Sequence, residues 1–360
     1  MPSTSSLAQL TAPPFIGTLL QGERNTIADV PGVTVGHSTL DDGGIQTGVT
    51  VIRPHQGDPF RDKVPAAAVV LNGFGKSVGL VQLAELGVLE TPIALTNTFS
   101  VGTVATAQIR QCAAANPETG RSLPTVNPLV FECNDGFLND IQRLAVSEAD
   151  YLRAHDGAAA DFAQGSVGAG RGMSSFQLKG GIGSASRRVS ARGGGLHTVG
   201  TLVLANYGRQ PQLLLAGHAI GDRLAQLQAV RGVPASTEPE KGSIIIVVAT
   251  DAPLDARQLG RLALRAGAGL ARTGSVYGHG SGDIVLAFST AYTVPGSVER
   301  PMPAVAMLHD GLLDGLFQAA ADSTEQAIIH ALWQATAVTG RDGNHRASLR
   351  DLLPALSLSS

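Results

Sequence analysis

One serine of this sequence, Ser243, stands at the junction between a polar loop and an apolar run that predicts a buried strand. In "STEPEKGSIIIVVATDAPL", residues 236–254, a polar loop runs into five β-branched residues, and Ser243 follows Gly242 at the junction. Local pattern alone favours an interior strand with an ordinary Gly-Ser entrance. However, a serine hydroxyl behind a residue without a side chain can attack the preceding carbonyl. An N→O acyl shift and hydrolysis would cut the chain there and leave Ser243 a free α-amine, whose pKa of about 7.7–8.0 suits a base.

A second serine competes with the first. The stretch "GKSVG", residues 75–79, satisfies G-x-S-x-G, follows an apolar run and precedes the helix-like "LVQLAELG", which is the context of a nucleophile elbow. Ser77 would then be the nucleophile of an α/β-hydrolase esterase, with His197, His218 or His309 as the base. A third alternative is a scaffold that stays uncleaved, binds a ligand and catalyses nothing.

Other motifs indicate no cofactor and no metal. "NGFGKS" ends like a phosphate-binding loop, but Val70 stands where that pattern needs its first glycine. "GAGRGM" has Met173 in place of the last glycine of a dinucleotide fingerprint. Cys112 and Cys133 fit neither a disulfide framework nor a CxxC metal site, and no spacing of histidines and acids resembles a ligand set.

Composition describes a globular protein with no strong field around it. The chain has 360 residues, 43% of them hydrophobic, and a formal net charge of −3. A nearly balanced charge argues against nucleic acid and anionic membranes as partners. The N-terminus lacks the basic and apolar regions of a secretory signal, and no run of about eighteen apolar residues occurs. We therefore expect a cytoplasmic protein.

Strands and helices alternate in a way that predicts a layered α/β fold. Five apolar strands are expected at 66–72, 92–97, 198–208, 243–250 and 283–290. Helical patterns cover 100–115, 136–155, 255–273 and 323–338. Two polar stretches are predicted to be loops, 186–197 and 233–242. The basic cluster of Arg187, Arg188 and Arg192 fits a solvated surface loop.

Several long segments of the chain resemble one known family. They are "NTIADVPGVTVGHSTLDDGGIQTGVTVI", "KVPAAAVVLNGFGKSVGLVQLAELGVLETPIALTNTFSVGT", "ECNDGFLNDI", "GSVGAGRGMSSFQLKGGIGSASR" and "KGSIIIVVATDAPLDARQLGRLALRA". Together they are similar to the DmpA-type L-aminopeptidase/D-esterase family, which includes the β-peptidyl aminopeptidases. The resemblance runs in order over roughly residues 20–345. Segments of this length are far more specific than any short motif.

The resemblance implies a fold, a processing event and a substrate class. The fold is a four-layer αββα sandwich, similar to that of the N-terminal-nucleophile hydrolases, in one catalytic domain over 1–360. Cleavage at Gly242-Ser243 would give chains 1–242 and 243–360 that stay together. Substrates are short peptides, amides or esters with a free N-terminal amine, and relatives form tetramers of processed heterodimers. A homo-oligomer is therefore expected by analogy.

Site residues follow from the same resemblance, position by position. Ser243 matches the nucleophile, and Asn206 of "LANYG" matches the donor that stabilises an oxyanion. Glu132 of "FECNDG" matches the acid that holds the substrate ammonium. Ser281 and Asp283 of "GHGSGD" match the pair that supports the nucleophile, where relatives carry a glutamate at the second position. An aspartate is one methylene shorter, so its reach is a question for the structure.

Overall fold

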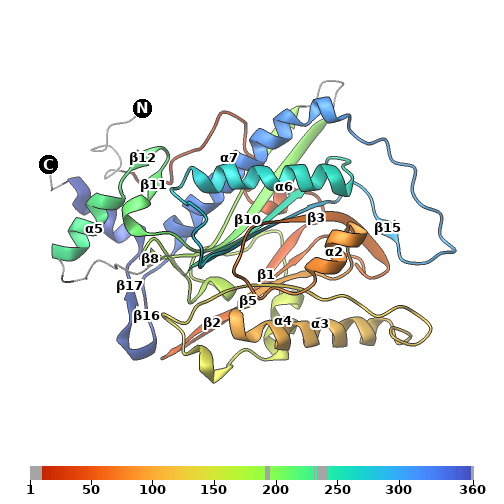
Figure 1. Cartoon of the computed structure of the whole chain (residues 1–360), viewed down its shortest axis with the longest axis horizontal. Helices are drawn as coiled ribbons and strands as arrows, with labels where there is room; N and C mark the ends of the chain where they lie inside the picture. The colour runs from red at the N-terminus through yellow and green to blue at the C-terminus, as the bar shows by residue number, and fades with distance from the viewer. Residues whose placement is uncertain (1–9, 191–194, 231, 233–241, 358–360) are drawn as a thin grey trace.

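Two β-sheets stacked between two layers of helices form the molecule, as the computed structural model shows (Figure 1). The structure describes residues 10–190, 195–230, 232 and 242–357. The loop predicted over 233–242 lies outside the described residues except for its last residue, Gly242. Within the part that is described, no helix is long and apolar enough to cross a membrane.

The larger sheet has seven strands and contains the strand that begins at Ser243. In chain order they are β3 (Asp62–Gly73), β4 (Val88–Leu89), β9 (Gly181–Ser190), β10 (Leu196–Asn206), β13 (Ser243–Thr250), β14 (Gly282–Ser289) and β15 (Val294–Pro295). Their spatial order is β15-β3-β14-β13-β10-β9, with β4 beside β3. Only β13 and β14 pair in parallel within this sheet. β13 is buried on both faces, which is why its sequence is continuously apolar instead of alternating.

The smaller sheet has four strands in the order β1-β2-β5-β6. They are β1 (Thr34–Asp42), β2 (Ile45–Arg53), β5 (Ile93–Asn97) and β6 (Leu129–Cys133). The two sheets pack face to face through side chains such as Leu95 and Phe131 on one side and Ile245 and Val247 on the other. This shared core fixes the ends of β6 and β13 near each other, and the site residues lie at those ends.

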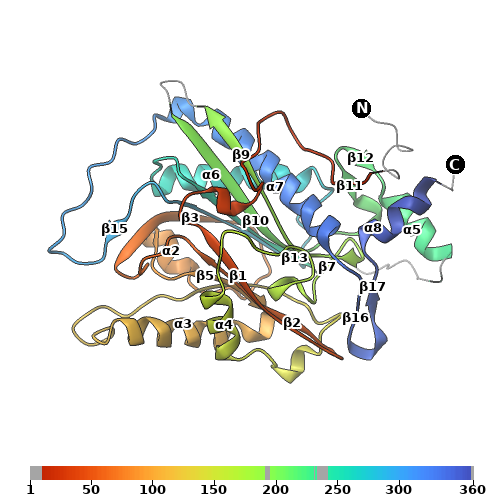
Figure 2. The same ribbon diagram turned by 180° about the vertical axis from the view of Figure 1, so that it is seen from behind.

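Helices cover the outer face of each sheet. α6 (Ala256–Ala271) and α7 (Asp314–Gln334) pack on the larger sheet, and α3 (Val101–Ala115) and α4 (Glu148–Asp156) lie against the smaller one (Figures 1 and 2). The order of layers is therefore αββα, as predicted. The remaining helices and short strands are α2 (Leu80–Leu86), α5 (Gly221–Val230), α8 (Leu349–Leu352), β7 (Ser174–Ser175), β8 (Leu178–Lys179), β11 (Leu214–Leu215), β12 (His218–Ala219), β16 (Val338–Thr339) and β17 (His345–Arg346).

All five predicted strands are present, but two helices differ from their predictions. The helix expected over 136–155 forms only over its second half, as α4. Leu144 has a φ of 47°, a left-handed conformation that a helix cannot contain. Ser147 and Asp150 then build a capping box, in which the Ser147 amide donates to the Asp150 carboxylate at 2.8 Å, and this marks the true start of the helix.

The helix expected over 323–338 begins nine residues earlier and ends at Gln334. α7 is buried on all sides from residue 319 to residue 333, so this stretch lacks the polar face that marks a surface helix. Its end is set by Ala335, which adopts an extended conformation with a ψ of 137°.

The predicted loop over 186–197 is wrong at both ends. β9 continues to Ser190 and β10 begins at Leu196, while 191–194 lie outside the described residues. Arg187 is not solvated but fully buried, where its guanidinium donates to the Ile16 carbonyl at 2.7 Å. A buried guanidinium needs such partners, and no sequence pattern announces them.

Candidate active site

Ser243 opens β13 with its hydroxyl in a buried, structured place. The side chain is 6% exposed, and its Oγ accepts a hydrogen bond from the Gly282 amide at 3.0 Å. The β-branched residues that follow favour an extended chain, and pairing with β10 and β14 on either side fixes it. The strand therefore holds the serine in one position between two neighbouring strand ends.

A glycine is required at position 242 because the backbone of Asn206 and Tyr207 passes very close to it. A Cβ atom at this position would lie 2.1 Å from the Asn206 carbonyl oxygen and 2.7 Å from the Tyr207 Cα. Because both atoms belong to the backbone, neither can move aside as a flexible side chain would. Glycine is thus the residue that lets the chain enter β13 here, and it leaves the carbonyl before Ser243 without a side chain beside it.

Asn206 is the last residue of β10 and the register partner of Ser243. Its Oδ1 accepts from the Ser174 amide at 2.8 Å, and its Nδ2 donates to the Asn134 carbonyl at 3.0 Å. An amide N–H can only donate and a carbonyl can only accept, so these two contacts fix which way the side chain is turned. The second Nδ2 hydrogen has no acceptor among the described residues, which leaves one donor beside the nucleophile.

Ser281 and Asp283 reach the site from the start of β14. The Ser281 hydroxyl donates to the Asp283 carboxylate at 2.5 Å, and both side chains are buried. The shorter aspartate therefore reaches Ser281 directly. The residue between them, Gly282, is the one whose amide donates to Ser243, and the Asn72 side chain holds the Ser281 carbonyl in place.

Glu132 enters from the smaller sheet, near the end of β6. Its carboxylate is 3% exposed and accepts from the Lys76 amide at 2.8 Å and from the Thr98 hydroxyl. Gly75 lies alongside: a Cβ there would be 3.7 Å from Glu132 Oε1 and 3.8 Å from the Gly282 Cα. The backbone of Gly75 therefore lies between Glu132 and Gly282, the residue whose amide donates to Ser243.

The five predicted side chains converge, and the arrangement has a clear chemical order. The Ser243 hydroxyl lies at strand ends that also bear an amide donor and a buried serine–aspartate pair, and a buried carboxylate lies on the far side of Gly75. Such a set can attack a carbonyl, stabilise the oxyanion that forms and hold a cationic group of the substrate. Among the described residues no cluster of histidine, cysteine and acidic side chains could hold a metal ion.

Ser77, the competing serine, lacks this surrounding. Its buried hydroxyl has no hydrogen-bond partner among the described residues. Val78 pairs with Val130 of the smaller sheet before helix α2 begins, so the chain does not make the abrupt strand-to-helix turn of a nucleophile elbow. The larger sheet is also mainly antiparallel, unlike the parallel sheet of an α/β-hydrolase.

Some residues of the site were missed because their contacts are not local. Lys179 is fully buried, and its ammonium donates to the carbonyls of Gly170, Met173 and Gly180 at 2.8, 3.0 and 2.8 Å. Burial lowers the pKa of this amine well below its usual value. By holding Met173, Lys179 fixes the segment whose next amide, that of Ser174, orients Asn206.

Asp135 was also missed, although it lies inside the quoted motif "FECNDG". Burial raises the pKa of its carboxyl to about 7. Asn139 donates to its Oδ1 at 3.0 Å, while Oδ2 has no hydrogen-bond partner among the described residues. In the sequence Asp135 is only an acid next to Asn134, the residue whose carbonyl accepts from Asn206. An acid next to an asparagine is too common a pattern to predict a buried site.

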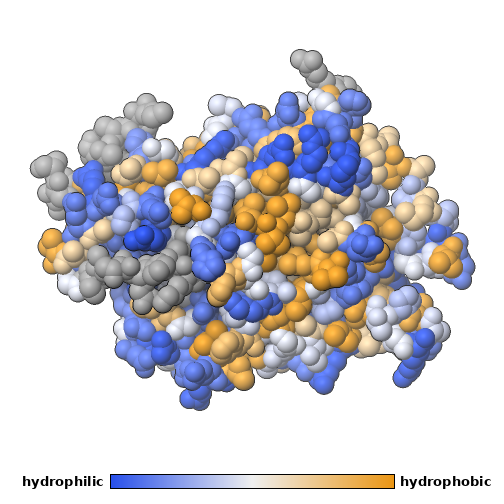
Figure 3. Space-filling model, in the orientation of Figure 1, coloured by the Kyte–Doolittle hydropathy of each residue, from blue (hydrophilic) through white to orange (hydrophobic). Residues whose placement is uncertain are grey.

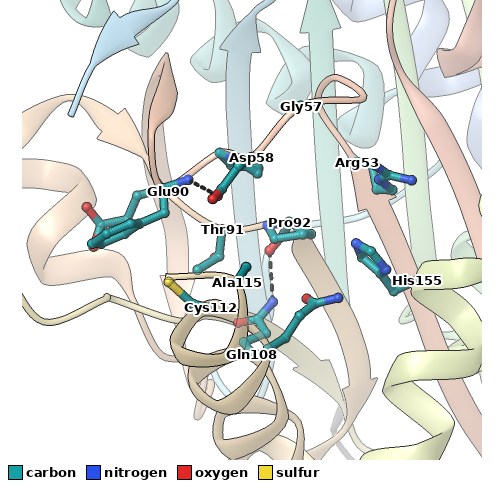
Figure 4. A pocket seen from close by; sticks show the side chains of 13 residues that line it. Arg53, Gly57, Asp58, Glu90, Thr91, Pro92, Gln108, Cys112, Ala115 and His155 are labelled. Carbon is teal, nitrogen blue, oxygen red and sulfur yellow. Dashed lines mark hydrogen bonds between the residues drawn. The ribbon is translucent and has the colours of Figure 1, made fainter. Parts of the chain in front are cut away.

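A separate cavity of about 280 Å³ lies at the opposite end of β5 and α3 (Figure 4). Arg53 and His155 line one side of it, and Glu90 and Cys112 line the other. It contains none of the predicted site residues. β5 starts beside this cavity and ends at Asn97, close to Glu132, so the strand separates the two places.

Comparison with known proteins places the chain among peptidases. A model of peptidase family S58 matches residues 25–346. The β-peptidyl aminopeptidase BapA of Sphingosinicella microcystinivorans is 39% identical over 348 residues, which cover 92% of this chain and 86% of that protein. A β-aminopeptidase structure from Burkholderia sp. has a TM-score of 0.85 and 41% identity, with 95% of each chain covered.

The fold itself has a solved counterpart. The L-aminopeptidase D-Ala-esterase/amidase of Ochrobactrum anthropi, described as a variant of the Ntn-hydrolase fold, has a TM-score of 0.85 and 34% identity over 95% of this chain and 96% of that one. The predicted relation of this αββα sandwich to the N-terminal-nucleophile hydrolases is confirmed.

Proposed function

The chain belongs to peptidase family S58, a family of hydrolases that includes aminopeptidases, and from that premise we propose that it processes itself at Gly242-Ser243 and uses Ser243 as its nucleophile. One observation carries this proposal: the Ser243 hydroxyl accepts from the Gly282 amide and faces the strand end where Asn206 keeps a free amide donor. Ser77 has no comparable set of neighbours.

Processing begins at the peptide bond between Gly242 and Ser243. The Ser243 Oγ attacks the Gly242 carbonyl carbon, the C–N bond breaks and an ester forms while the nitrogen becomes the α-amine of Ser243. Water then hydrolyses the ester, which returns the hydroxyl and leaves Gly242 with a carboxylate. The products are chains of 242 and 118 residues. The missing Cβ at Gly242 supports this step because it lets the chain pass close to the Asn206 backbone and brings the Gly242 carbonyl to the start of β13.

Turnover repeats the same attack on a substrate. The hydroxyl of Ser243 attacks the carbonyl of the first residue, Asn206 stabilises the oxyanion, and the α-amine or the Ser281–Asp283 pair takes the proton and delivers it to the leaving group. An acyl-enzyme remains on Ser243. Water deacylates it and releases the first residue as a free acid.

Glu132 gives the reaction its requirement for a free N-terminus. A buried carboxylate pairs with an ammonium by charge-assisted hydrogen bonds, and its own donors from Lys76 and Thr98 keep it oriented. The substrates that follow are short peptides, amides or esters with a free N-terminal amine. Because two named relatives are β-peptidyl aminopeptidases, we include substrates whose first residue is a β-amino acid.

N-acetylation of the substrate tests this proposal. The wild-type protein should hydrolyse a free-amine p-nitroanilide and lose most of its kcat/KM when that amine is acetylated. Glu132→Gln should lose activity on the free amine while the chain still processes, since the two steps need different residues. Equal rates on the free and acetylated substrates would show that the protein is not an aminopeptidase.

We also propose that the processed protein forms a homo-oligomer. A hydrophobic area occupies the middle of one face, over the region where Figure 1 draws β3, α2 and α6 (Figure 3). Large apolar side chains are exposed on these elements, directly after β3 and on the loop after α6, namely Val70, Phe74, Val81, Leu86, Leu264 and Val276. Light scattering of the purified protein tests this, and a monomer at micromolar concentration would contradict it.

A further inference from the structure

Arg346 is a guanidinium without an acid. It lies on β17, where its Nε donates to the Ser174 hydroxyl at 3.1 Å and its guanidinium carbon lies 3.5 Å from the centre of the Phe137 ring. Among the described residues no carboxylate lies within salt-bridge distance of it, whereas the more exposed Arg257 and Arg272 each pair with an aspartate. Burial lowers its pKa to about 10, so it stays charged at neutral pH.

Two contacts connect this charge to the reacting centre. The Ser174 hydroxyl accepts from Arg346, and the Ser174 amide donates to Asn206, the register partner of Ser243. The Arg346 guanidinium also stacks on the ring of Phe137. Phe137 belongs to the same loop as Asn134, whose carbonyl accepts from Asn206. Both routes lead from Arg346 to the oxyanion side of the nucleophile.

The β16–β17 hairpin holds Arg346 in this place. Asn344 donates to the Phe137 carbonyl at 2.9 Å, and Arg341 donates to the Gly136 carbonyl at 3.2 Å. A Cβ at Gly340 would lie 1.9 Å from the Leu138 carbonyl oxygen, so the hairpin rests directly on this loop. An arginine held by its backbone and by a ring loses little freedom when a ligand binds its remaining donors.

Opposite charges are therefore connected to Ser243 by two different routes. The route from Glu132 passes through Gly75 and Gly282. The route from Arg346 passes through Ser174 and Asn206. A dipeptide also carries two opposite charges, an ammonium before the scissile bond and a carboxylate one residue after it. That residue spans at most about 3.6 Å of extended chain, so the carboxylate stays close to the reacting carbonyl.

We propose that Arg346 binds the C-terminal carboxylate of the leaving residue, which makes short free-acid peptides the preferred substrates. This inference rests on the proposed function, because it assigns the far end of the same substrate. Two lysines also lie near the site among the described residues. Lys179 is fully buried, and its ammonium donates to three backbone carbonyls. Lys76 is exposed and lies over Phe74, on the Glu132 side. Lys76 therefore lies near the proposed binding place of the substrate ammonium, and the C-terminal carboxylate of the substrate does not reach it.

The experiment compares three substrates with the same N-terminal residue. They are a dipeptide with a free C-terminal carboxylate, the same dipeptide as its C-terminal amide, and the p-nitroanilide, with β-alanine or L-alanine first, whichever is cleaved faster. In the wild type the free acid should exceed the amide in kcat/KM by about 10- to 100-fold, the usual worth of a hydrogen bond to a charged group. The difference should lie in KM, because this contact is made before and during the reaction alike.

Arg346→Met keeps an unbranched side chain over Phe137 and removes the charge. It should lower kcat/KM for the free acid to the level of the amide, so the acid-to-amide ratio falls to about one, whereas any change transmitted through Ser174 and Asn206 affects all three substrates alike and leaves that ratio unchanged. Arg350→Met is the matched control, since Arg350 is an exposed arginine four residues further along, and it should change none of the three rates.

Each outcome decides one of two questions. No hydrolysis of any of the three substrates would overturn the proposed function itself. Hydrolysis of acid and amide at equal rates by the wild type would overturn the role of Arg346 while the aminopeptidase stands, and this reading needs no variant that folds. Equal losses on all three substrates in Arg346→Met, at an unchanged thermal midpoint, would likewise mean that Arg346 only supports the loop.

Discussion

Ser77 and Ser243 each have a glycine within two positions in the sequence, and their surroundings in the fold differ. Ser77 satisfies a known catalytic spacing, yet its buried hydroxyl has no hydrogen-bond partner among the described residues. Ser243 satisfies no catalytic spacing, yet its hydroxyl accepts from Gly282 and stands beside Asn206. The short motif contains Ser77, whereas the hydrogen-bonded surroundings belong to Ser243.

The difference teaches what a short motif can report. G-x-S-x-G tests only the five residues within it, whereas a nucleophile needs groups from several strands at once. Around Ser243 these groups come from β6, β10 and the start of β14. Around Ser77 the glycines have another use: a Cβ at Gly79 would lie 2.4 Å from the Pro128 carbonyl oxygen, so this glycine permits close packing between the sheets.

The largest effect should separate the two serines completely. Ser243→Ala removes the attacking oxygen, so the protein should remain one chain of 360 residues and lose measurable peptidase activity. Ser77→Ala should process to chains of 242 and 118 residues and keep its activity, because no step is assigned to its hydroxyl. Intact-mass spectrometry of both purified variants checks this.

One result would reverse the comparison. If Ser243→Ala still gave a new N-terminus at residue 243, the chain would be cut by another group or by another protein. Thermal midpoints equal to that of the wild type are needed in both variants, so that loss of processing is not loss of folding.

Asp283 should give the next largest effect. Asp283→Asn keeps the shape but removes the charge that accepts from Ser281, and kcat should fall by roughly 10²- to 10⁴-fold, the range for loss of a positioned acid–base group. Asp283→Glu keeps the charge and should do much less harm. Full activity of the asparagine variant, once processed, would leave the α-amine of Ser243 as the base.

Asn206 should follow with a somewhat smaller effect. Asn206→Ala removes the free amide donor beside the nucleophile, and one such donor is worth about 2.7–4 kcal/mol, or 10²- to 10³-fold in kcat. Asn116→Ala is the control, because Asn116 is equally buried but binds Arg61 and Asp58 near the distant cavity. Unchanged kcat in processed Asn206→Ala would remove this residue from the oxyanion site.

Sequence predicted the strands of this site better than its connections. The β-branched run after Ser243 could only be an interior strand, and the structure has it over the expected residues. The apolar residues of 136–155 have helical spacing and therefore predicted one helix. The left-handed Leu144 interrupts it, and the Gly136 amide donates to the side chain of Asn134. Side-chain bonds to the local backbone compete with a helix, and periodicity does not record them.

The supporting contacts could not have been predicted at all. Ser174 and Asn134 orient Asn206 from 32 and 72 positions away, each through a backbone group that every residue type possesses. Arg187 looked like part of a basic surface loop and is a buried anchor for the Ile16 carbonyl. Composition reports which charges exist, and only the fold decides which of them are buried.

The smallest predicted effect concerns stability and again lies on the Ser243 side. Asp135 is fully buried next to Asn134, and its pKa is raised to about 7 from 3.8, so the folded state holds this proton where the unfolded state has lost it. As pH rises from about 4 to about 7, the unfolded chain binds fewer protons than the folded one. The contribution of Asp135 to the free energy of unfolding therefore falls across this window, at a limit of about 1.4 kcal/mol per pH unit, and is constant above it.

Asp135→Asn should remove that slope, because the amide accepts from Asn139 as the acid does and does not titrate. Its thermal midpoint, compared with the wild type, should improve steadily between pH 5 and pH 7 and then run parallel up to pH 8.5, since every other titrating group is common to both proteins. Asp255→Asn, at the partly buried N-cap of α6, is the control substitution of the same kind. Parallel curves for Asp135→Asn over the whole range would mean that the carboxyl is already ionised at pH 5. Burial of Asp135 would then cost the fold no stability, and the difference between Ser77 and Ser243 would concern hydrogen bonding alone.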